Sequence, residues 1–171
     1  MRNKLIAVIN GKGGAGKDTL CECIRDIMPI MNISSVDPIK AIARQHGWNG
    51  EKDDRSRRFL AELKRVFAEY NDLPTMYLTE KTKEFLESDA QVLFVHIREP
   101  LEIEKYRTAI APSECVTILV RREEVHKGSR YGNAADDGVE NYDYDVVFRN
   151  APPLEDAKRR FRELISALMK A

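Results

Sequence analysis

Residues 11 to 19 constrain the fold more than any other part of the chain, because four glycines and two lysines lie here between an apolar run and an amphipathic segment. The loop reads Gly-Lys-Gly-Gly-Ala-Gly-Lys-Asp-Thr. The run before it, Leu5 to Ile9, is typical of a strand buried on both faces of a parallel sheet. After the loop, one face of a predicted helix carries Leu20, Ile24, Ile27, Met28 and Met31. The sequence therefore predicts a strand, a glycine loop and a helix in direct succession.

Similar apolar runs recur along the chain and alternate with helical patterns. Further strands are expected at Ile33 to Val36, Val92 to Ile97, Val116 to Val120 and Val146 to Phe148. Strands that alternate with amphipathic helices are typical of an α/β sandwich with a mainly parallel sheet. A chain of 171 residues has room for one compact domain. We therefore expect a single domain over residues 1–171, a three-layer α/β sandwich whose five-stranded parallel sheet has helices on both faces.

The glycine loop fits the pattern G-x-x-x-x-G-K-[ST], in which glycines let successive backbone N–H groups turn inward on phosphates. Gly11, Gly16 and Lys17 occupy the defined positions. The residues between them, which would line the phosphates, are Lys12, Gly13, Gly14 and Ala15. The lysine suits β and γ phosphates, and the helix that follows directs the positive end of its dipole at them. We predict that residues 11 to 19 bind ATP.

Asp18 stands where the pattern has serine or threonine. A carboxylate beside phosphates is repulsive unless a cation lies between them, so Asp18 is expected to ligate Mg²⁺ or to hold a metal-bound water. Thr19 is rotated by about 100° around the helix from that position, and its hydroxyl and N–H are better placed for the α phosphate. The predicted cofactors are ATP and Mg²⁺.

Gly16-Lys17-Asp18 resembles the end of the phosphate loop in two groups of small kinases, the phage-type deoxynucleoside monophosphate kinases and the animal-type phosphomevalonate kinases. Three further segments resemble the first group, namely Ser35 to Lys40, Ile97 to Glu102 and Asp145 to Asn150. His96, which directly precedes the second of these segments, stands where the family usually has an aspartate. For the third, the resemblance implies that Asn150 borders the adenine.

The resemblance implies a P-loop kinase fold that transfers the γ-phosphoryl group of Mg·ATP to a small phosphorylated acceptor. A nucleoside or deoxynucleoside monophosphate is the acceptor we expect, and phosphomevalonate-like or dephospho-coenzyme A-like acceptors are the alternatives. Lys12 to Lys17 also resembles the phosphate loop of the dimeric partitioning and nitrogenase-iron-protein ATPases, where the early lysine reaches the partner's nucleotide. Those ATPases keep a threonine in place of Asp18. A nucleotide-binding module without catalysis is a third possibility, which Asp18 and His96 leave open.

The acceptor region is expected at residues 38 to 90, where helical patterns separate the second strand from the third. Asp37 follows the second strand at the C-terminal edge of the sheet, where open α/β sheets bind ligands. It is therefore a candidate for orienting the acceptor or acting as a base, or alternatively for capping the helix that begins at Pro38. Arg55 and Arg58 share a helical face that could grip the phosphate of the acceptor, or could form a solvated face with ion pairs.

A lid is expected at residues 121 to 145, because Lys127 to Asp145 contains three glycines, several acids and almost no aliphatic residues. Closure of such a segment would exclude water and bring Arg121 and Arg130 to the transferring group. The alternative is an ordinary flexible loop. Arg98, just past the third strand, is expected at the same edge. The predicted catalytic residues are Lys17, Asp37, Arg98, Arg121 and Arg130.

Composition argues against several other classes of protein. Lysine plus arginine and aspartate plus glutamate are 28 each, so net charge gives no support for duplex nucleic acid as a partner. No apolar run approaches the roughly 18 residues that span a bilayer, and the start lacks a signal-peptide cleavage region. We expect a cytoplasmic protein that does not bind membranes. The three histidines show no metal-ligand spacing. The sequence leaves the oligomeric state open.

Overall fold

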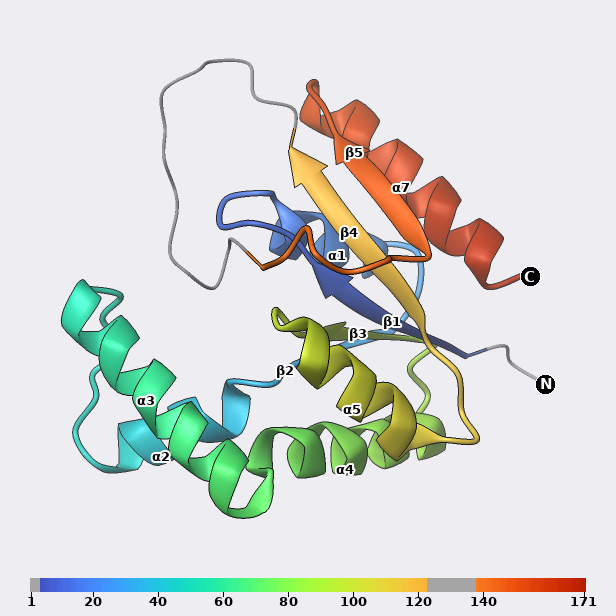
Figure 1. Cartoon of the computed structure of the whole chain (residues 1–171). Coiled ribbons are helices and arrows are strands. Elements are labelled where there is room, and N and C mark those ends of the chain that lie inside the picture. The colour runs from blue at the N-terminus through green and yellow to red at the C-terminus, as the bar shows by residue number, and fades with distance from the viewer. Residues whose placement is uncertain (1–3, 123–137) are drawn as a thin grey trace.

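The computed structural model describes residues 4–122 and 138–171, within which five parallel strands form one sheet in the order β2-β3-β1-β4-β5. The strands are β1 (Leu5–Asn10), β2 (Ile30–Ser34), β3 (Val92–His96), β4 (Val116–Arg122) and β5 (Val146–Asn150). All four neighbouring pairs run parallel, with Ala7 of β1 opposite Phe94 of β3 and Val116 of β4. Figure 1 shows the sheet between two groups of helices. The predicted fold class is confirmed.

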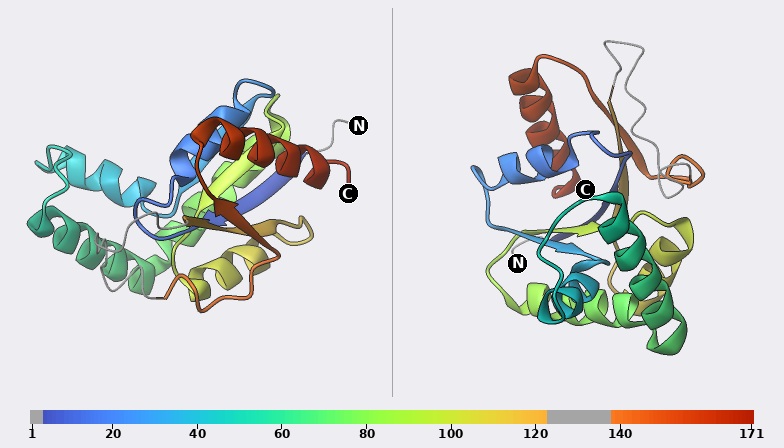
Figure 2. Two further views of the ribbon diagram at one scale, coloured as in Figure 1. Left: turned by 90° about the horizontal axis from the view of Figure 1, so that it is seen from above. Right: turned by 90° about the vertical axis from the view of Figure 1, so that its left-hand side faces the viewer.

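Each face of the sheet carries a hydrophobic core, and β1 contributes to both because successive side chains of a strand point to opposite sides. In β1, Ala7 and Ile9 belong to a core with residues of α1 (Lys17–Ile24) and α7 (Leu154–Leu168). Ile6 and Val8 belong to a second core with residues of α4 (Leu73–Glu87) and α5 (Pro100–Ile110). Figure 2 shows the resulting layers, with α1 and α7 on one side of the sheet and α4 and α5 on the other.

Three helices occupy the region between β2 and β3, namely α2 (Asp37–Gln45), α3 (Asp54–Asn71) and α4. In Figures 1 and 2, α2 and α3 extend beyond the edge of the sheet. No residue of α3 is buried, and Phe59 and Val66 on its apolar face are 45% and 50% exposed. The helices expected at residues 38 to 90 are therefore present, but α3 contributes little to the core.

Two predicted element boundaries are wrong. Helix α1 ends at Ile24 and does not continue to Met31, which lies in β2. The chain tightens after Ile24, where the N–H of Arg25 bonds to the carbonyl of Glu22, and the ring of Pro29 then prevents further helix. The second strand spans Ile30–Ser34 instead of residues 33–36. It ends where the Asp37 carboxylate accepts the N–H of Ser34 over 2.7 Å.

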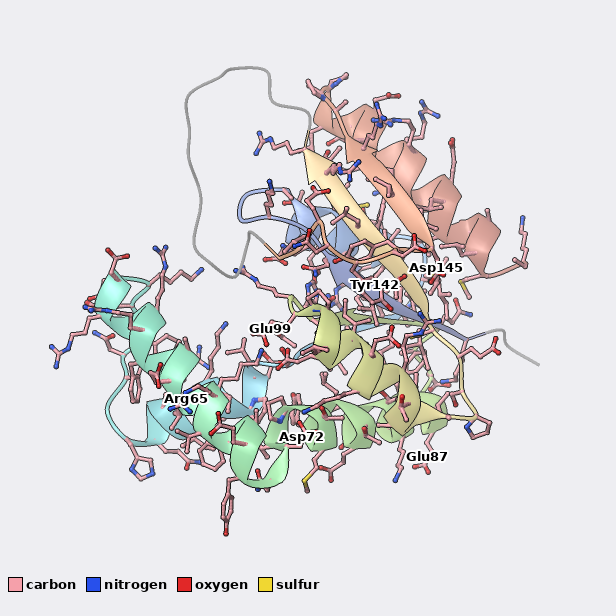
Figure 3. All side chains as sticks on the ribbon, in the orientation of Figure 1. Arg65, Asp72, Glu87, Glu99, Tyr142 and Asp145 are labelled. Carbon is pink, nitrogen blue, oxygen red and sulfur yellow. The ribbon has the colours of Figure 1, made fainter. Side chains whose placement is uncertain are left out.

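Residues 138 to 145 pack against the sheet, although we expected this stretch to be part of a mobile surface segment. Val139 is fully buried, and the hydroxyl of Tyr144 donates to its carbonyl oxygen over 2.8 Å. Asp145 accepts hydrogen bonds from the N–H and the hydroxyl of Thr117 in β4, both over 2.8 Å. Figure 3 shows Tyr142 and Asp145 beside β4. The rest of the expected lid, residues 123–137 with Arg130, lies outside the described residues.

Among the described helices, none has both the length and the apolar character needed to cross a membrane.

Candidate functional site

The loop between β1 and α1 is held against the neighbouring strands so closely that glycine is required at two positions. A Cβ at Gly11 would lie 2.6 Å from the carbonyl oxygen of Val120 in β4. A Cβ at Gly16 would lie 2.5 Å from Nδ2 of Asn150 in β5, and Gly16 has a φ of 87° that favours glycine. Helix α1 begins directly afterwards, and no described side chain caps its first turn. A helix N-terminus of this kind is suited to anions.

Lys17 lies over this loop. Its Nζ donates to the carbonyl oxygen of Gly11 over 3.1 Å, so the side chain folds back from α1 across the glycines. The ammonium and the positive end of the α1 dipole therefore act on the same small volume. This arrangement of charge and backbone fits the triphosphate of ATP.

Two side chains, one from β5 and one from β4, hold the loop in place through hydrogen bonds. Asn150 donates through Nδ2 to the carbonyl oxygen of Ala15 over 2.8 Å, and Arg122 donates through Nη1 to that of Gly14 over 3.0 Å. The sequence places Arg122 beside Arg121 at this edge, where we predicted no binding or catalytic role for it, although the alternation along β4 could have indicated one. Val120 packs with α1, so Arg122, two residues on, shares its face. Arg121 points to the opposite face, where its Nε donates to Oε2 of Glu140 over 3.0 Å.

Asn10 connects the loop to residues 138–145, the packed end of the expected lid. It is fully buried, and its Oδ1 accepts the N–H of Gly11 over 2.9 Å. Its Nδ2 donates to the carbonyl oxygen of Arg98 over 3.0 Å and to the hydroxyl of Tyr144 over 2.8 Å. One amide thus joins the ends of β1 and β3 to residues 138–145. The signal for Asn10 in the sequence is a polar residue that ends an apolar strand directly before the glycines.

Asp18 lies at the mouth of the site beside the end of β3. Its side chain is 93% exposed, and its Oδ1 lies 3.9 Å from Nδ1 of His96. Burial lowers the pKa of His96, while the negative charge of Asp18 opposes that shift. The charge of Lys17 also lowers this pKa, and the charge of Asp37 raises it.

The residues of this region fit a nucleotide-bound magnesium ion. No group of three or more His, Cys, Asp or Glu side chains within the described ranges could hold a metal by itself. Mg²⁺ in nucleotide sites, however, keeps several waters and takes one or two carboxylates together with phosphate oxygens. Asp18 would supply one such carboxylate next to the phosphate loop.

Asp37 lies at the start of α2, but it does not cap that helix. The cap is Val36, and the Asp37 carboxylate holds the end of β2 instead, through the N–H of Ser34. Tyr77 of α4 lies nearby, and its pKa is raised by burial and then by the charge of Asp37. A carboxylate at the C-terminal edge of the sheet could accept a hydrogen bond from a ligand.

The other predicted arginines within the described residues lie on the surface. Arg98 is exposed after β3, and Arg55 and Arg58 are exposed on α3. Arg65, further along α3 in Figure 3, forms intrahelical ion pairs with Glu62 and Glu69 at 3.0 Å each, as a solvated face would. Roles for Arg55, Arg58 and Arg98 in binding or catalysis stay predictions.

A partly buried ion pair, which no sequence spacing indicates, ties α3 to the active edge of the sheet. Nζ of Lys64 lies 2.8 Å from Glu102 and 3.5 Å from Glu99, at the beginning of α5. The side chains of Lys64 and Glu102 are only 15% and 14% exposed. Burial raises the pKa of Glu102, and Lys64 opposes the shift. Figure 3 shows Glu99 between α3 and the sheet.

Comparison with protein-family models gives no match, and neither does comparison with curated proteins. Solved structures do match. TT1252 from Thermus thermophilus has a TM-score of 0.51 and 20% identity, with 97% of this chain and 98% of that chain covered. A sugar kinase from Janibacter sp. has a TM-score of 0.53, 12% identity and 95% coverage of both chains. A gluconokinase from Sinorhizobium meliloti has a TM-score of 0.51 and 17% identity, with 99% of this chain and 96% of that chain covered. At such identities, these likenesses show that the chain has the fold of P-loop kinases.

Proposed function

We propose that the chain is an ATP-dependent phosphotransferase that moves the γ-phosphoryl group of Mg·ATP to a small phosphorylated acceptor, a nucleoside or deoxynucleoside monophosphate. The observation that carries the proposal is the loop of residues 11–16, which closes against β4 and β5 at two glycines. Lys17 lies across that loop, and the uncapped first turn of α1 follows it. Backbone donors and a positioned ammonium at one point are what phosphoryl transfer requires of a protein.

When bound, Mg·ATP supplies the phosphoryl group and the cation that neutralises its charge. Lys17 and the loop backbone would hold the β and γ phosphates, while Asp18 would hold the metal. Asp37 would accept a hydrogen bond from the acceptor and orient it toward the loop. Arg122, already bound to the Gly14 carbonyl, would keep the loop in its binding conformation.

The choice of acceptor is supported by the position of α2, α3 and α4 and by the resemblance of Ser35 to Lys40 to monophosphate kinases. Arg55 and Arg58 lie on α3 and would bind the acceptor phosphate as bidentate donors. Phosphomevalonate has a phosphate but no base, whereas dephospho-coenzyme A has both phosphate and adenine and carries a pantetheine arm in addition. An assay with all three kinds of acceptor therefore identifies the one that the protein uses.

Arg121 would contact the transferring phosphoryl group only if its guanidinium released Glu140. Its guanidinium is bound to Glu140 here, and phosphate oxygens would have to replace that carboxylate on closure. Arg98 would add positive charge from the end of β3. These two roles, and that of Arg130, belong to the proposal.

The test is a coupled assay of ADP release with purified protein, Mg·ATP and a panel of nucleoside monophosphates, phosphomevalonate and dephospho-coenzyme A. We expect acceptor-dependent ADP release with a nucleoside monophosphate and little without an acceptor. Release that is independent of every acceptor would favour the ATPase alternative. Tight ATP binding without any release would favour a binding module. Lys17→Ala serves as the inactive control.

A further inference from the structure

His96 ends β3 on the side of the sheet that faces α1. Val92 and Phe94 of the same strand pack in the core formed with α1 and α7, and His96 continues that row because side chains two residues apart share a face. Its side chain is 19% exposed. The ring therefore lies between Asn32 of β2 and Asp18 in the first turn of α1.

The hydrogen bonds of Asn32 decide which ring nitrogen of His96 carries the proton. Nδ2 of Asn32 donates to Oε1 of Glu22 over 2.9 Å, and a carboxylate can only accept. The amide oxygen Oδ1 of Asn32 must then face His96, and it lies 3.2 Å from Nε2. Because Oδ1 can also only accept, Nε2 carries the hydrogen. In the neutral ring, the lone pair is on Nδ1.

Nδ1 of His96 lies 3.9 Å from Oδ1 of Asp18, and in the neutral ring both atoms are acceptors. This separation is too long for a hydrogen bond. One divalent cation can contact both atoms once the exposed Asp18 side chain turns to bring Oδ1 to about 3 Å from Nδ1, because adjacent ligands of an octahedral ion with bonds of about 2.1 Å lie about 3 Å apart. Asp18 is the one carboxylate within residues 11–19, so the nitrogen would add a second protein ligand to the site.

We propose that Nδ1 of His96, together with Asp18, ligates the divalent cation that accompanies the nucleotide, and that this nitrogen ligand shifts the preference of the site from Mg²⁺ toward Mn²⁺. The inference rests on the proposed function, since it takes residues 11–19 as the nucleotide site. Mg²⁺ prefers oxygen ligands, whereas imidazole suits the transition metals. Asn32 is a positioning residue, because its amide fixes the ring and the tautomer.

The direct test is pulsed electron paramagnetic resonance of Mn²⁺ bound with a non-hydrolysable ATP analogue. We expect hyperfine coupling to an imidazole nitrogen in the wild type, changed on labelling the histidines with heavy nitrogen, and absent in His96→Ala. His46→Ala is the matched control, because His46 is exposed at the end of α2. Circular dichroism checks that each variant is folded.

Metal affinities give a second readout. Calorimetric titration of the analogue with Mn²⁺ or Mg²⁺ should show that His96→Asp lowers the Mn²⁺ to Mg²⁺ affinity ratio. Asn32→Leu should weaken Mn²⁺ binding by about tenfold or more, as the loss of an outer-shell partner does. If the analogue binds with Mn²⁺ but shows no nitrogen coupling, and His96→Ala leaves the affinity ratio unchanged, His96 is not a ligand and the proposed function still stands. If the analogue does not bind to the wild type, the proposed function and this inference both fail.

Discussion

Asn150 donates a hydrogen bond through its side-chain amide to the carbonyl oxygen of Ala15 over 2.8 Å, so the end of β5 is fastened to the phosphate loop. The same nitrogen would lie 2.5 Å from a Cβ at Gly16. The hydrogen bond and the missing side chain depend on each other, since a larger residue at 16 would displace the amide. The last strand of the sheet thereby acts on the first loop of the chain.

Gly16→Ala is expected to destabilise the protein more than Gly14→Ala. Both glycines have positive φ, 87° and 76°, so each alanine has the left-handed penalty of about 1 to 2 kcal/mol. Only the alanine at 16 meets another residue, because nothing lies within 4 Å of a Cβ at Gly14. Urea denaturation measures the two free energies of unfolding. Equal decreases in the unfolding free energy would show that the Asn150 side chain moves aside without destabilising the protein.

Lys17→Ala is expected to abolish phosphoryl transfer and leave the fold intact, because its ammonium lies across the loop at the Gly11 carbonyl. Removing one positioned electrostatic group from an active site typically costs about 10² to 10³ in kcat. The coupled assay measures the rate, and circular dichroism measures the fold. Turnover at the wild-type rate would contradict the kinase proposal.

Lys12→Ala is the control for the same loop. Lys12 is exposed, so its loss should matter little to a kinase that works as a monomer. In the dimeric ATPases that Lys12 to Lys17 also resembles, the early lysine would be essential. Loss of activity together with loss of ATP-dependent dimerisation would favour that alternative.

Arg121 and Arg122 are adjacent, yet we expect their alanine variants to behave differently. Arg122→Ala should weaken ATP binding by about tenfold or less, because it removes one hydrogen bond to the loop. Arg121→Ala should leave ATP binding near the wild-type value, because Arg121 is bound to Glu140. It should lower kcat and kcat/KM together if the guanidinium reaches the transferring group on closure. An unchanged kcat would make the Arg121 ion pair purely structural.

The sequence predicted the sheet and the loop because both depend on local patterns. Apolar runs of the right length mark the buried parallel strands, and the glycines mark the turn into α1. The end of α1 and the start of β2 were predicted wrongly. Ile27, Met28 and Met31 continue the helical spacing of apolar residues, although the helix ends at Ile24 and Met31 lies in β2. Period alone does not separate a last helical turn from the strand that follows.

Other parts of the site depend on contacts between distant residues. The hydrogen bond between Asn10 and Tyr144 joins residues 134 apart, and the Lys64–Glu102 pair joins residues 38 apart. Their partners are set by how the strands and helices pack, which no local spacing encodes. Arg122 differs from them, since strand alternation from Val120 was sufficient to place it on the face of the loop.

Tyr144→Phe is expected to be less stable than the wild type at neutral pH, and the difference in unfolding free energy should shrink as the pH rises. At neutral pH the variant lacks the hydrogen bonds of the hydroxyl to Asn10 and Val139 and should be less stable, by about 1 kcal/mol for each bond. Burial raises the pKa of Tyr144 to about 12, above the value of about 10 in an unfolded chain. Between these values the unfolded state loses its proton and the folded state keeps it, so the wild type loses stability as the pH rises.

The measurement is urea denaturation of both proteins from pH 8 to pH 11. The other tyrosines are the same in the two proteins and contribute equally. The difference in unfolding free energy should therefore narrow above about pH 10. Parallel curves would show that the Tyr144 hydroxyl titrates alike in the folded and unfolded chains.

Asp18→Asn is expected to raise the Mg²⁺ concentration needed for half-maximal activity. The substitution keeps the size of the side chain but removes the charge that draws the cation to the phosphates, and we expect a rise of about tenfold or more. Asp18→Ser supplies the hydroxyl that the loop pattern usually has and should retain substantial activity, since phosphate oxygens then provide the remaining negative charge. Asp18 also lies in the first turn of α1, where an acid stabilises the helix by about 0.3 to 1 kcal/mol. If Asp18→Asn changes only the unfolding free energy, by that amount, and leaves the magnesium dependence as it was, the carboxylate serves the helix and does not bind the metal.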